Sequence, residues 1–132
     1  MAKNSKIPDN YQTVMPYLIV KDAAKFIAFM QKVFDAKETY KTMRDEHTIM
    51  HAEMMIGGST IMFADSTEKF SVRTGGFFIY VDDADATYKK AIDTGATTVT
   101  EVADQSYGRS GGVQDPFGNV WWVTSVNTEK QL

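Results

Sequence analysis

The feature of this sequence that most constrains its fold is an internal repeat. PYLIVKDA, residues 16–23, aligns with FFIYVDDA, residues 77–84, and IGGSTIMF, residues 56–63, aligns with PFGNVWWV, residues 116–123. In each copy an apolar run ends in valine, an acidic residue follows where a helix can begin, and a glycine turn precedes the last apolar run. A repeat of this length predicts two similar structural units in tandem.

Hydrophobic periodicity assigns the same order of elements to both copies. Apolar residues at helical spacing indicate one helix in each copy, with Asp22 and Asp83 as the expected caps. Gly57-Gly58 predicts a tight turn, and Gly95 predicts the end of the second helix. Short β-branched and aromatic runs indicate strands. The predicted elements are a strand over 14–20, a helix over 22–34, strands over 36–44, 47–56 and 59–65, a strand over 76–81, a helix over 84–94, and strands over 97–103, 108–115 and 119–125.

Two copies of a strand, a helix and three further strands define an α+β fold, a duplicated βαβββ unit with a mostly β core. An α+β sandwich without a repeat is the alternative on the pattern alone. The polar stretch STEKFSVRTG indicates a linker between the copies. The predicted organisation is a polar N-terminal tail over 1–13, a first unit over 14–65, a linker over 66–75, a second unit over 76–126 and a C-terminal tail over 127–132.

Composition and charge exclude several classes of function. The chain of 132 residues has a net charge of -3 and no clustered run of Lys or Arg, so we expect no nucleic-acid partner. It has no cysteine, which removes disulfides and thiolate chemistry and fits a reducing compartment. The polar start lacks the apolar stretch of a signal peptide, and no apolar run approaches the ~20 residues that span a bilayer. We therefore expect a cytoplasmic protein without a membrane partner.

Four stretches of the chain resemble the vicinal oxygen chelate superfamily, which includes glyoxalases, bleomycin-resistance proteins and extradiol dioxygenases. Within it they are similar to the PhnB-like branch, whose members often carry a YG.R.G...DPFG..W ending. The resemblance implies that the curled mixed sheets of the two units enclose a cleft, with the helices on the outer face. It also implies a homodimer that holds a small molecule, as bleomycin-resistance proteins hold a drug. The stretches are MPYLIVKDAAKFIAFMQKVFDAK, HAEMMIGGSTIMFAD, YVDDADATYKKAIDTGA and YGRSGGVQDPFGNVWWV.

The same resemblance raises the question of a metal. Enzymes of this superfamily hold a divalent metal with His, Glu or Gln from the first and last strands of each unit, because a Lewis acid needs converging N or O donors. His51 and Glu53 could hold a metal between them, but a third donor could come only from a mobile Asp65 or Asp115. We therefore expect neither a metal nor another cofactor. The positions that the resemblance implies for the ligands are occupied by Met15, Met62, Gly76 and Trp122.

Strand alternation divides the side chains of each copy between two faces. The Gly57-Gly58 turn pairs Glu53 with Met62, which puts His51 on the same face as both. Transferring this register to the second copy by the repeat spacing puts Trp122 on one face with Arg109, Gly111 and Val113. The predicted ligand-binding residues are Tyr17, His51, Glu53, Met62, Phe78, Tyr80, Tyr107, Arg109 and Trp122.

Two groups of polar residues have alternative roles. His51 and Glu53 could act as a general base and its partner, or they could form a partly buried pair that anchors a ligand or a neighbouring strand. Arg109 could grip a carboxylate or phosphate, or it could pair with an acidic neighbour such as Glu101 or Asp104. Asp115-Pro116-Phe117-Gly118 is predicted to be turn chemistry.

Three interpretations of function follow. The preferred one is a protein that binds a small, partly aromatic or anionic molecule in an aromatic-lined cleft without a metal. The alternative is an enzyme, either a lyase, isomerase or dioxygenase with an atypical metal site, or a metal-free acid/base catalyst that uses His51. The third is an interaction module whose cleft is closed.

Overall fold

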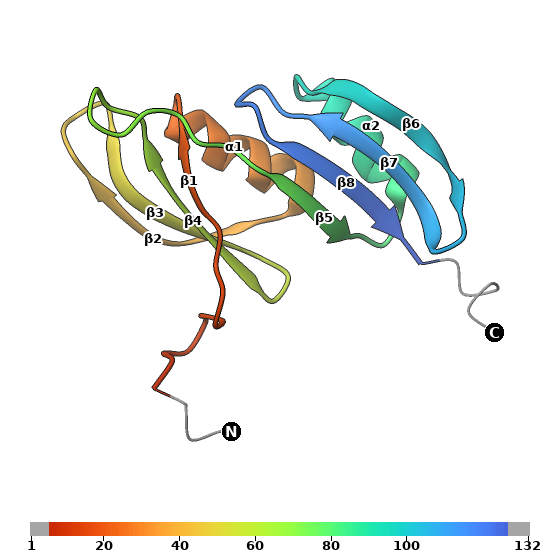
Figure 1. Cartoon of the computed structure of the whole chain (residues 1–132), viewed down its shortest axis with the longest axis horizontal. Helices are drawn as coiled ribbons and strands as arrows, with labels where there is room; N and C mark the ends of the chain where they lie inside the picture. The colour runs from red at the N-terminus through yellow and green to blue at the C-terminus, as the bar shows by residue number, and fades with distance from the viewer. Residues whose placement is uncertain (1–5, 127–132) are drawn as a thin grey trace. The chain divides into compact units, whose positions relative to one another are not determined.

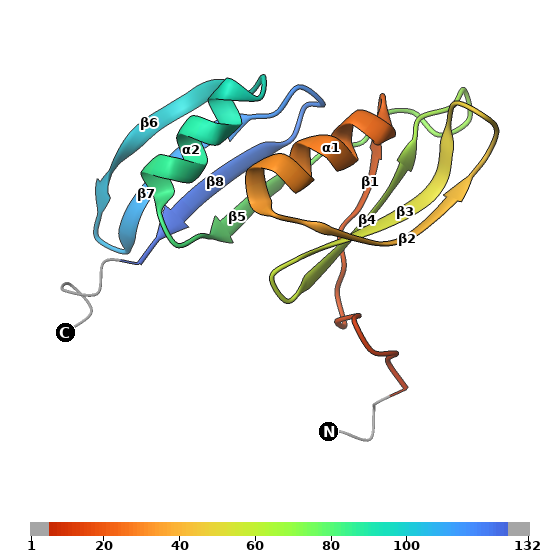
Figure 2. The same ribbon diagram turned by 180° about the vertical axis from the view of Figure 1, so that it is seen from behind.

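The computed structural model describes residues 6–126, which form two compact units that divide between Arg73 and Thr74. Each unit is a four-stranded mixed sheet with one helix packed on one face (Figure 1 and, from behind, Figure 2). The predicted α+β class and the tandem βαβββ order are confirmed. Within residues 6–126 no helix is both long enough and apolar enough to cross a membrane.

The first unit consists of β1 (Tyr17–Val20), α1 (Ala23–Phe34), β2 (Lys37–Met43), β3 (Ile49–Ile56) and β4 (Ser59–Asp65). Its strands lie in the order β1-β4-β3-β2, with β1 parallel to β4 and the other neighbours antiparallel. Helix α1 turns its apolar side to the sheet, because large side chains recur there at helical spacing. Phe26 of α1 meets Phe63 of β4 edge to face, with ring centroids 5.0 Å apart.

The second unit consists of β5 (Gly76–Tyr80), α2 (Ala84–Asp93), β6 (Thr97–Gln105), β7 (Gly108–Gln114) and β8 (Val120–Ser125). Its strands lie in the order β5-β8-β7-β6, which repeats the topology of the first unit. Helix α2 buries only Ala84 and Ala91 of its own side chains. The core on this side of the sheet comes mainly from the strands, where buried Trp121 stacks on Phe77 with ring centroids 4.4 Å apart.

The sequence repeat reappears in the strand pairing. Tyr17 pairs with Met62 across β1 and β4, and the equivalent Phe78 pairs with Trp122 across β5 and β8. In the first unit β3 and β4 pair Glu53 with Met62, so the predicted faces of this hairpin are confirmed. The faces opposite the helices therefore carry the residues that the alternation predicted for β1, β3, β4 and β5.

The predicted cap of α1 is wrong. Asp22 has a left-handed backbone conformation, with φ of 60°, and its side chain makes no capping hydrogen bond. Buried Asp65 at the end of β4 accepts a hydrogen bond from the Ala23 N–H at 2.8 Å and another from the Ile49 N–H at 2.7 Å. The carboxylate of Asp65 thus accepts the capping hydrogen bond that was expected to go to Asp22, whereas α2 has the predicted cap, Asp83.

The predicted faces of β7 are wrong by one residue. Gly112, rather than Val113, pairs with Trp122, and Val113 pairs with the buried Trp121. The β3–β4 hairpin turns at residues 57–58 alone, whereas the β7–β8 hairpin turns over residues 115–119. Because the longer loop moves β7 by one position relative to β3, a register transferred from the first unit exchanges the two faces. Arg109, Gly111 and Val113 therefore lie on the helix side of the second sheet.

Candidate functional site

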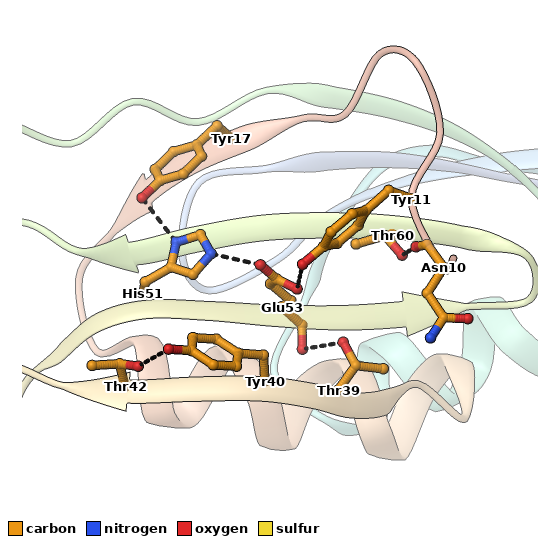
Figure 3. Close-up of polar contacts among 9 residues, drawn as sticks. All are labelled: Asn10, Tyr11, Tyr17, Thr39, Tyr40, Thr42, His51, Glu53 and Thr60. Atoms are coloured by element: carbon orange, nitrogen blue, oxygen red, sulfur yellow. Dashed lines mark hydrogen bonds and ion pairs between the residues drawn. The ribbon is translucent and has the colours of Figure 1, made fainter. Parts of the chain in front are cut away.

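A chain of hydrogen-bonded side chains lies on the face of the first sheet that is turned away from α1 (Figure 3). Glu53 Oε1 accepts a hydrogen bond from the Tyr11 hydroxyl at 2.7 Å, and Glu53 Oε2 lies 2.8 Å from His51 Nε2. The other ring nitrogen, His51 Nδ1, lies 3.0 Å from the Tyr17 hydroxyl oxygen. We call these four residues, Tyr11, Glu53, His51 and Tyr17, the polar chain.

Exposure rises along the polar chain from the carboxylate to the phenol of Tyr17. Glu53 is 5% exposed, whereas Tyr17 is 52% exposed. The hydrogen bond to Glu53 raises the pKa of Tyr11 above its ordinary value. Tyr40 also lies beside His51, with ring centroids 5.9 Å apart, but its hydroxyl is engaged by the Thr42 hydroxyl at 2.6 Å. The arrangement places an imidazole between a buried carboxylate and an exposed phenol.

Residues 10–12 complete this site, although they were predicted to belong to a polar tail. The Gln12 side chain donates to the Thr60 carbonyl at 3.0 Å and accepts from the Thr60 N–H at 3.2 Å. The Thr60 hydroxyl donates to the Asn10 carbonyl. These bonds hold the segment beside the start of β4 and so bring Tyr11 to Glu53; Figure 3 shows the contact of Asn10 with Thr60 and that of Tyr11 with Glu53. Tyr11 is the aromatic residue of the expected tail, and it was the one signal in the sequence that this stretch has a partner.

The residues present do not fit the metal site that the family resemblance implies. Both ring nitrogens of His51 already lie in hydrogen bonds to side chains. Asp65 and Asp115, which were expected to be mobile, are buried and hold backbone amides. Among residues 6–126 no group of three or more His, Asp or Glu side chains could hold a metal ion. The implied ligand positions carry Met15, Met62, Gly76 and Trp122, which offer no nitrogen or carboxylate donor.

Four exposed aromatic side chains gather in the second unit. Phe78 and Tyr80 alternate along β5 and meet edge to face, with ring centroids 5.3 Å apart. Tyr107, in the β6–β7 turn, lies 6.0 Å from Phe78 by ring centroids, and Trp122 pairs with Phe78 across the strands. We call Phe78, Tyr80, Tyr107 and Trp122 the aromatic face; their exposed fractions are 51%, 65%, 50% and 36%.

Gly112 fixes the position of Trp122 in the aromatic face. A Cβ atom at residue 112 would lie 2.5 Å from Trp122 Cζ3 and 2.7 Å from Cε3, closer than real Cβ atoms approach. The indole therefore lies against the β7 backbone, in space that only glycine leaves free. Trp122 is 36% exposed in this position.

Arg109 does not belong to either group, because the register of β7 turns it toward α2. Its guanidinium donates to both carboxylate oxygens of Asp85, at 2.6 Å and 3.1 Å, and to Asp104 at 3.1 Å. The pairing with Asp104 is the alternative that the sequence analysis left open. The prediction that Arg109 shares a face with Trp122 is wrong. The other predicted ligand residues lie as two groups, Tyr17, His51, Glu53 and Met62 in the first unit and the aromatic face in the second.

The ion pair of Arg109 predicts a specific dependence of stability on pH. The hydrogen bond from Arg109 lowers the pKa of Asp85 below its ordinary value, and both carboxylates raise the pKa of Arg109. A carboxyl with a lowered folded-state pKa stabilises the fold above its unfolded pKa of about 3.9, and this contribution is lost as pH falls through the folded pKa. We expect a small gap in melting temperature between wild type and Arg109→Ala at pH 7, because solvent screens exposed pairs. The gap should close below about pH 4, and a gap that persists unchanged to about pH 2 would contradict the assignment.

Comparisons with known proteins agree with this architecture. The family model described as Glyoxalase/Bleomycin resistance protein/Dioxygenase superfamily matches residues 11–123. An uncharacterized protein of Mycobacterium bovis is 36% identical over 118 residues, which cover 80% of this chain and 78% of the relative. The crystal structure of TioX from Micromonospora sp. ML1 has a TM-score of 0.70 at 21% identity and covers 88% of this chain and 97% of TioX. A PhnB protein from Bacillus cereus has a TM-score of 0.69 at 18% identity and covers 87% of this chain and 100% of its own.

Proposed function

This chain belongs to the glyoxalase/bleomycin resistance protein/dioxygenase superfamily, and we propose that it binds a small, flat, partly aromatic molecule without a metal. The observation that carries the proposal is the aromatic face. Soluble proteins seldom leave contiguous large apolar side chains exposed unless the patch has a partner. Flat ligands stack on such rings, and the exposed part of Trp122 would offer a surface for stacking.

The open face of the first unit carries a separate group of side chains that a ligand could contact. Tyr17 and His51 present polar atoms there, and Met62 lies beside them with an adaptable apolar side chain. Glu53 is buried and acts in this proposal by holding His51 rather than by touching the ligand.

Melting curves with a panel of planar aromatic compounds test the binding proposal. A ligand that binds only the folded protein stabilises it by about 2.7 kcal/mol at 100 times its Kd. We expect at least one compound to raise the melting temperature of wild type, and the Trp122→Ala protein to lose that rise. Phe70→Ala is the control, because Phe70 is also an exposed aromatic residue, at 56%, but is not part of the aromatic face. A panel without any stabilising compound would favour the interaction module instead.

The metal-free part of the proposal rests on the donor set. Methionine, glycine and tryptophan at the implied ligand positions leave a hard cation without a coordination shell. Elemental analysis of the purified protein should show no stoichiometric metal, and added Zn²⁺, Ni²⁺, Mn²⁺ or Fe²⁺ should not raise the melting temperature. A metal at one equivalent, or a rise of several degrees in melting temperature, would contradict this part of the proposal.

We also propose that the protein acts as a homodimer. Family resemblance suggests it, and among the described strands β2 and β6 end their sheets with one backbone edge unpaired by another strand. Light scattering should give twice the 14.8 kDa mass of one chain. A single-chain mass at micromolar concentration would refute the dimer.

A second candidate function is metal-free acid/base catalysis through His51. The hydrogen bond between His51 Nε2 and buried Glu53 favours it, because a carboxylate partner orients an imidazole and stabilises its protonated form. For any compound that the protein converts, this candidate expects a pH-dependent rate that His51→Ala abolishes. A rate that survives His51→Ala would remove it.

A further inference from the structure

We propose that Tyr17 is the group through which the polar chain exchanges a proton with a bound ligand, with His51 as the acceptor behind it. The inference deepens the second candidate function and rests on it. In this inference the atom that contacts the ligand is the phenol oxygen of Tyr17 rather than an imidazole nitrogen of His51.

The direction of the polar chain follows from its hydrogen bonds when Glu53 is ionised and His51 is neutral. An ionised carboxylate only accepts hydrogen bonds. It accepts one from Tyr11 at 2.7 Å, and the bond to His51 at 2.8 Å must then have the Nε2–H as its donor. In a neutral imidazole with a proton on Nε2, the other nitrogen is an acceptor. The Tyr17 hydroxyl therefore donates to His51 Nδ1 across 3.0 Å.

The exposure of the three groups leaves the phenol as the one that a ligand can reach most easily. Glu53 has 7% of its side chain exposed and His51 has 24%, whereas Tyr17 is 52% exposed as a residue. The lone pair of His51 Nδ1 is covered by the Tyr17 hydroxyl, and its Nε2–H is directed at Glu53. A ligand on this face would thus meet the Tyr17 oxygen before it meets a free imidazole nitrogen.

The chemistry consists of two coupled proton transfers through the phenol oxygen of Tyr17. The ligand gives a proton to the Tyr17 oxygen as the phenol gives its own proton to His51 Nδ1. The products are a ligand anion, a neutral Tyr17 and an imidazolium that faces the Glu53 carboxylate, so charge and atoms balance. Returning the proton to another atom of the ligand would isomerise it. The ligand class is therefore a molecule with a weakly acidic proton, on oxygen or on carbon next to a carbonyl group.

Tyr40 supplies a matched internal control for Tyr17. The two residues have the same exposure, 52%, and both rings lie near His51, with centroids 5.5 Å and 5.9 Å away. Only Tyr17 has its hydroxyl on the imidazole, because the Tyr40 hydroxyl is engaged by Thr42. A difference in reactivity between the two phenols therefore reports the hydrogen bond to His51 rather than solvent access.

Acetylation of the wild-type protein with N-acetylimidazole tests the inference without a known ligand. The Tyr17 oxygen bonds to the acetyl carbon, the reagent's acyl–nitrogen bond breaks, the phenol proton passes to His51, and the departing imidazole takes a proton from solvent. Positioned general bases contribute on the order of a hundredfold or more, so we expect Tyr17 to react at least about tenfold faster than Tyr40 by peptide mass spectrometry. Equal rates at the two tyrosines would overturn the inference.

Variants identify the origin of the faster rate. His51→Asn should lower the acetylation rate of Tyr17 to that of Tyr40. Glu53→Gln should lower it partially, because no carboxylate then stabilises the imidazolium. Tyr40 should keep its rate in both variants. A fast Tyr17 in the His51→Asn protein would also overturn the inference, because the imidazole would then not be its base.

Modification with diethylpyrocarbonate separates this inference from the second candidate function. With Tyr17 on Nδ1, His51 should react slowly in wild type and faster in Tyr17→Phe, whereas exposed His47 should react alike in both. If Tyr17 is acetylated no faster than Tyr40 and His51 reacts with diethylpyrocarbonate as fast as His47 in wild type, His51 is itself the accessible base. Only the present inference then fails. If Tyr17 is acetylated no faster than Tyr40 and His51 reacts slowly with diethylpyrocarbonate in both wild type and Tyr17→Phe, the present inference and the second candidate function both fail.

Discussion

The Asp115→Ala protein is expected to be about 3–5 kcal/mol less stable than wild type, because several buried donors lose their acceptor. The Asp115 side chain is buried and accepts four hydrogen bonds, three from the β7–β8 loop and one from Trp121 of β8. Its Oδ1 accepts from the backbone N–H of Phe117 and of Asn119, both at 2.9 Å. Its Oδ2 accepts from Asn119 Nδ2 at 3.1 Å and from Trp121 Nε1 at 2.8 Å. Alanine would leave these donors buried without an acceptor, which costs about 1–3 kcal/mol for each unsatisfied group.

Urea unfolding measures this loss of stability. Asp93→Ala is the control, because Asp93 forms an exposed pair with Lys89 at 2.7 Å, with side chains 61% and 76% exposed. Removal of an exposed pair should change stability by less than about 1 kcal/mol. The account of the β7–β8 loop would be wrong if Asp115→Ala cost no more than Asp93→Ala.

The Gly112→Ala protein is expected to lose the proposed ligand while it stays folded. The added methyl carbon would overlap Trp122 and push the indole away from β7. Loss of one aromatic stacking partner weakens binding by about 0.5–1.5 kcal/mol beyond the buried area. With the lost contact area we expect affinity to fall about tenfold or more, which corresponds to about 1.4 kcal/mol. Displacement of the indole should also change the fluorescence of Trp122.

Gly58→Ala is the matched control for this substitution. A Cβ at residue 58 would meet nothing within 4 Å, and Gly58 does not have a positive φ. Its melting temperature, fluorescence and affinity should match those of wild type. If Gly112→Ala kept the wild-type fluorescence and affinity, Trp122 would not be the stacking surface.

Local patterns in the sequence predicted the first unit well because its hairpin is short. The two-residue turn at Gly57-Gly58 fixes the pairing of β3 with β4, and alternation then gives the face of every residue. This is why Tyr17, His51 and Met62 were assigned correctly to one face.

The second unit was predicted less well because loop length, rather than strand pattern, sets the register of β7. The repeat suggested a turn like Gly57-Gly58, but the hydrogen bonds of Asp115 organise a longer loop over residues 115–119. The longer loop shifts the register of β7 by one residue, which places Arg109 on the helix side and Gly112 beneath Trp122.

Long-range polar contacts were beyond the reach of local sequence patterns. Asp22 stands at the usual capping position of α1, yet Asp65, far along the chain, caps the helix. Tyr11 reaches Glu53 across 42 positions of sequence. Neither partner can be read from spacing, because the closing contact depends on the tertiary fold.

The measurement that tests the central claim most directly is a nuclear magnetic resonance titration of the two indole N–H signals. The chain has two tryptophans, so each signal can be assigned by its absence in Trp122→Phe. Trp121 is buried with its indole N–H on Asp115, whereas Trp122 is exposed. On addition of a compound that stabilises the protein, we predict that the Trp122 signal moves and saturates at one equivalent per chain while the Trp121 signal moves less. A stabilising compound that leaves the Trp122 signal in place would show that binding occurs elsewhere and would contradict the proposed role of the aromatic face.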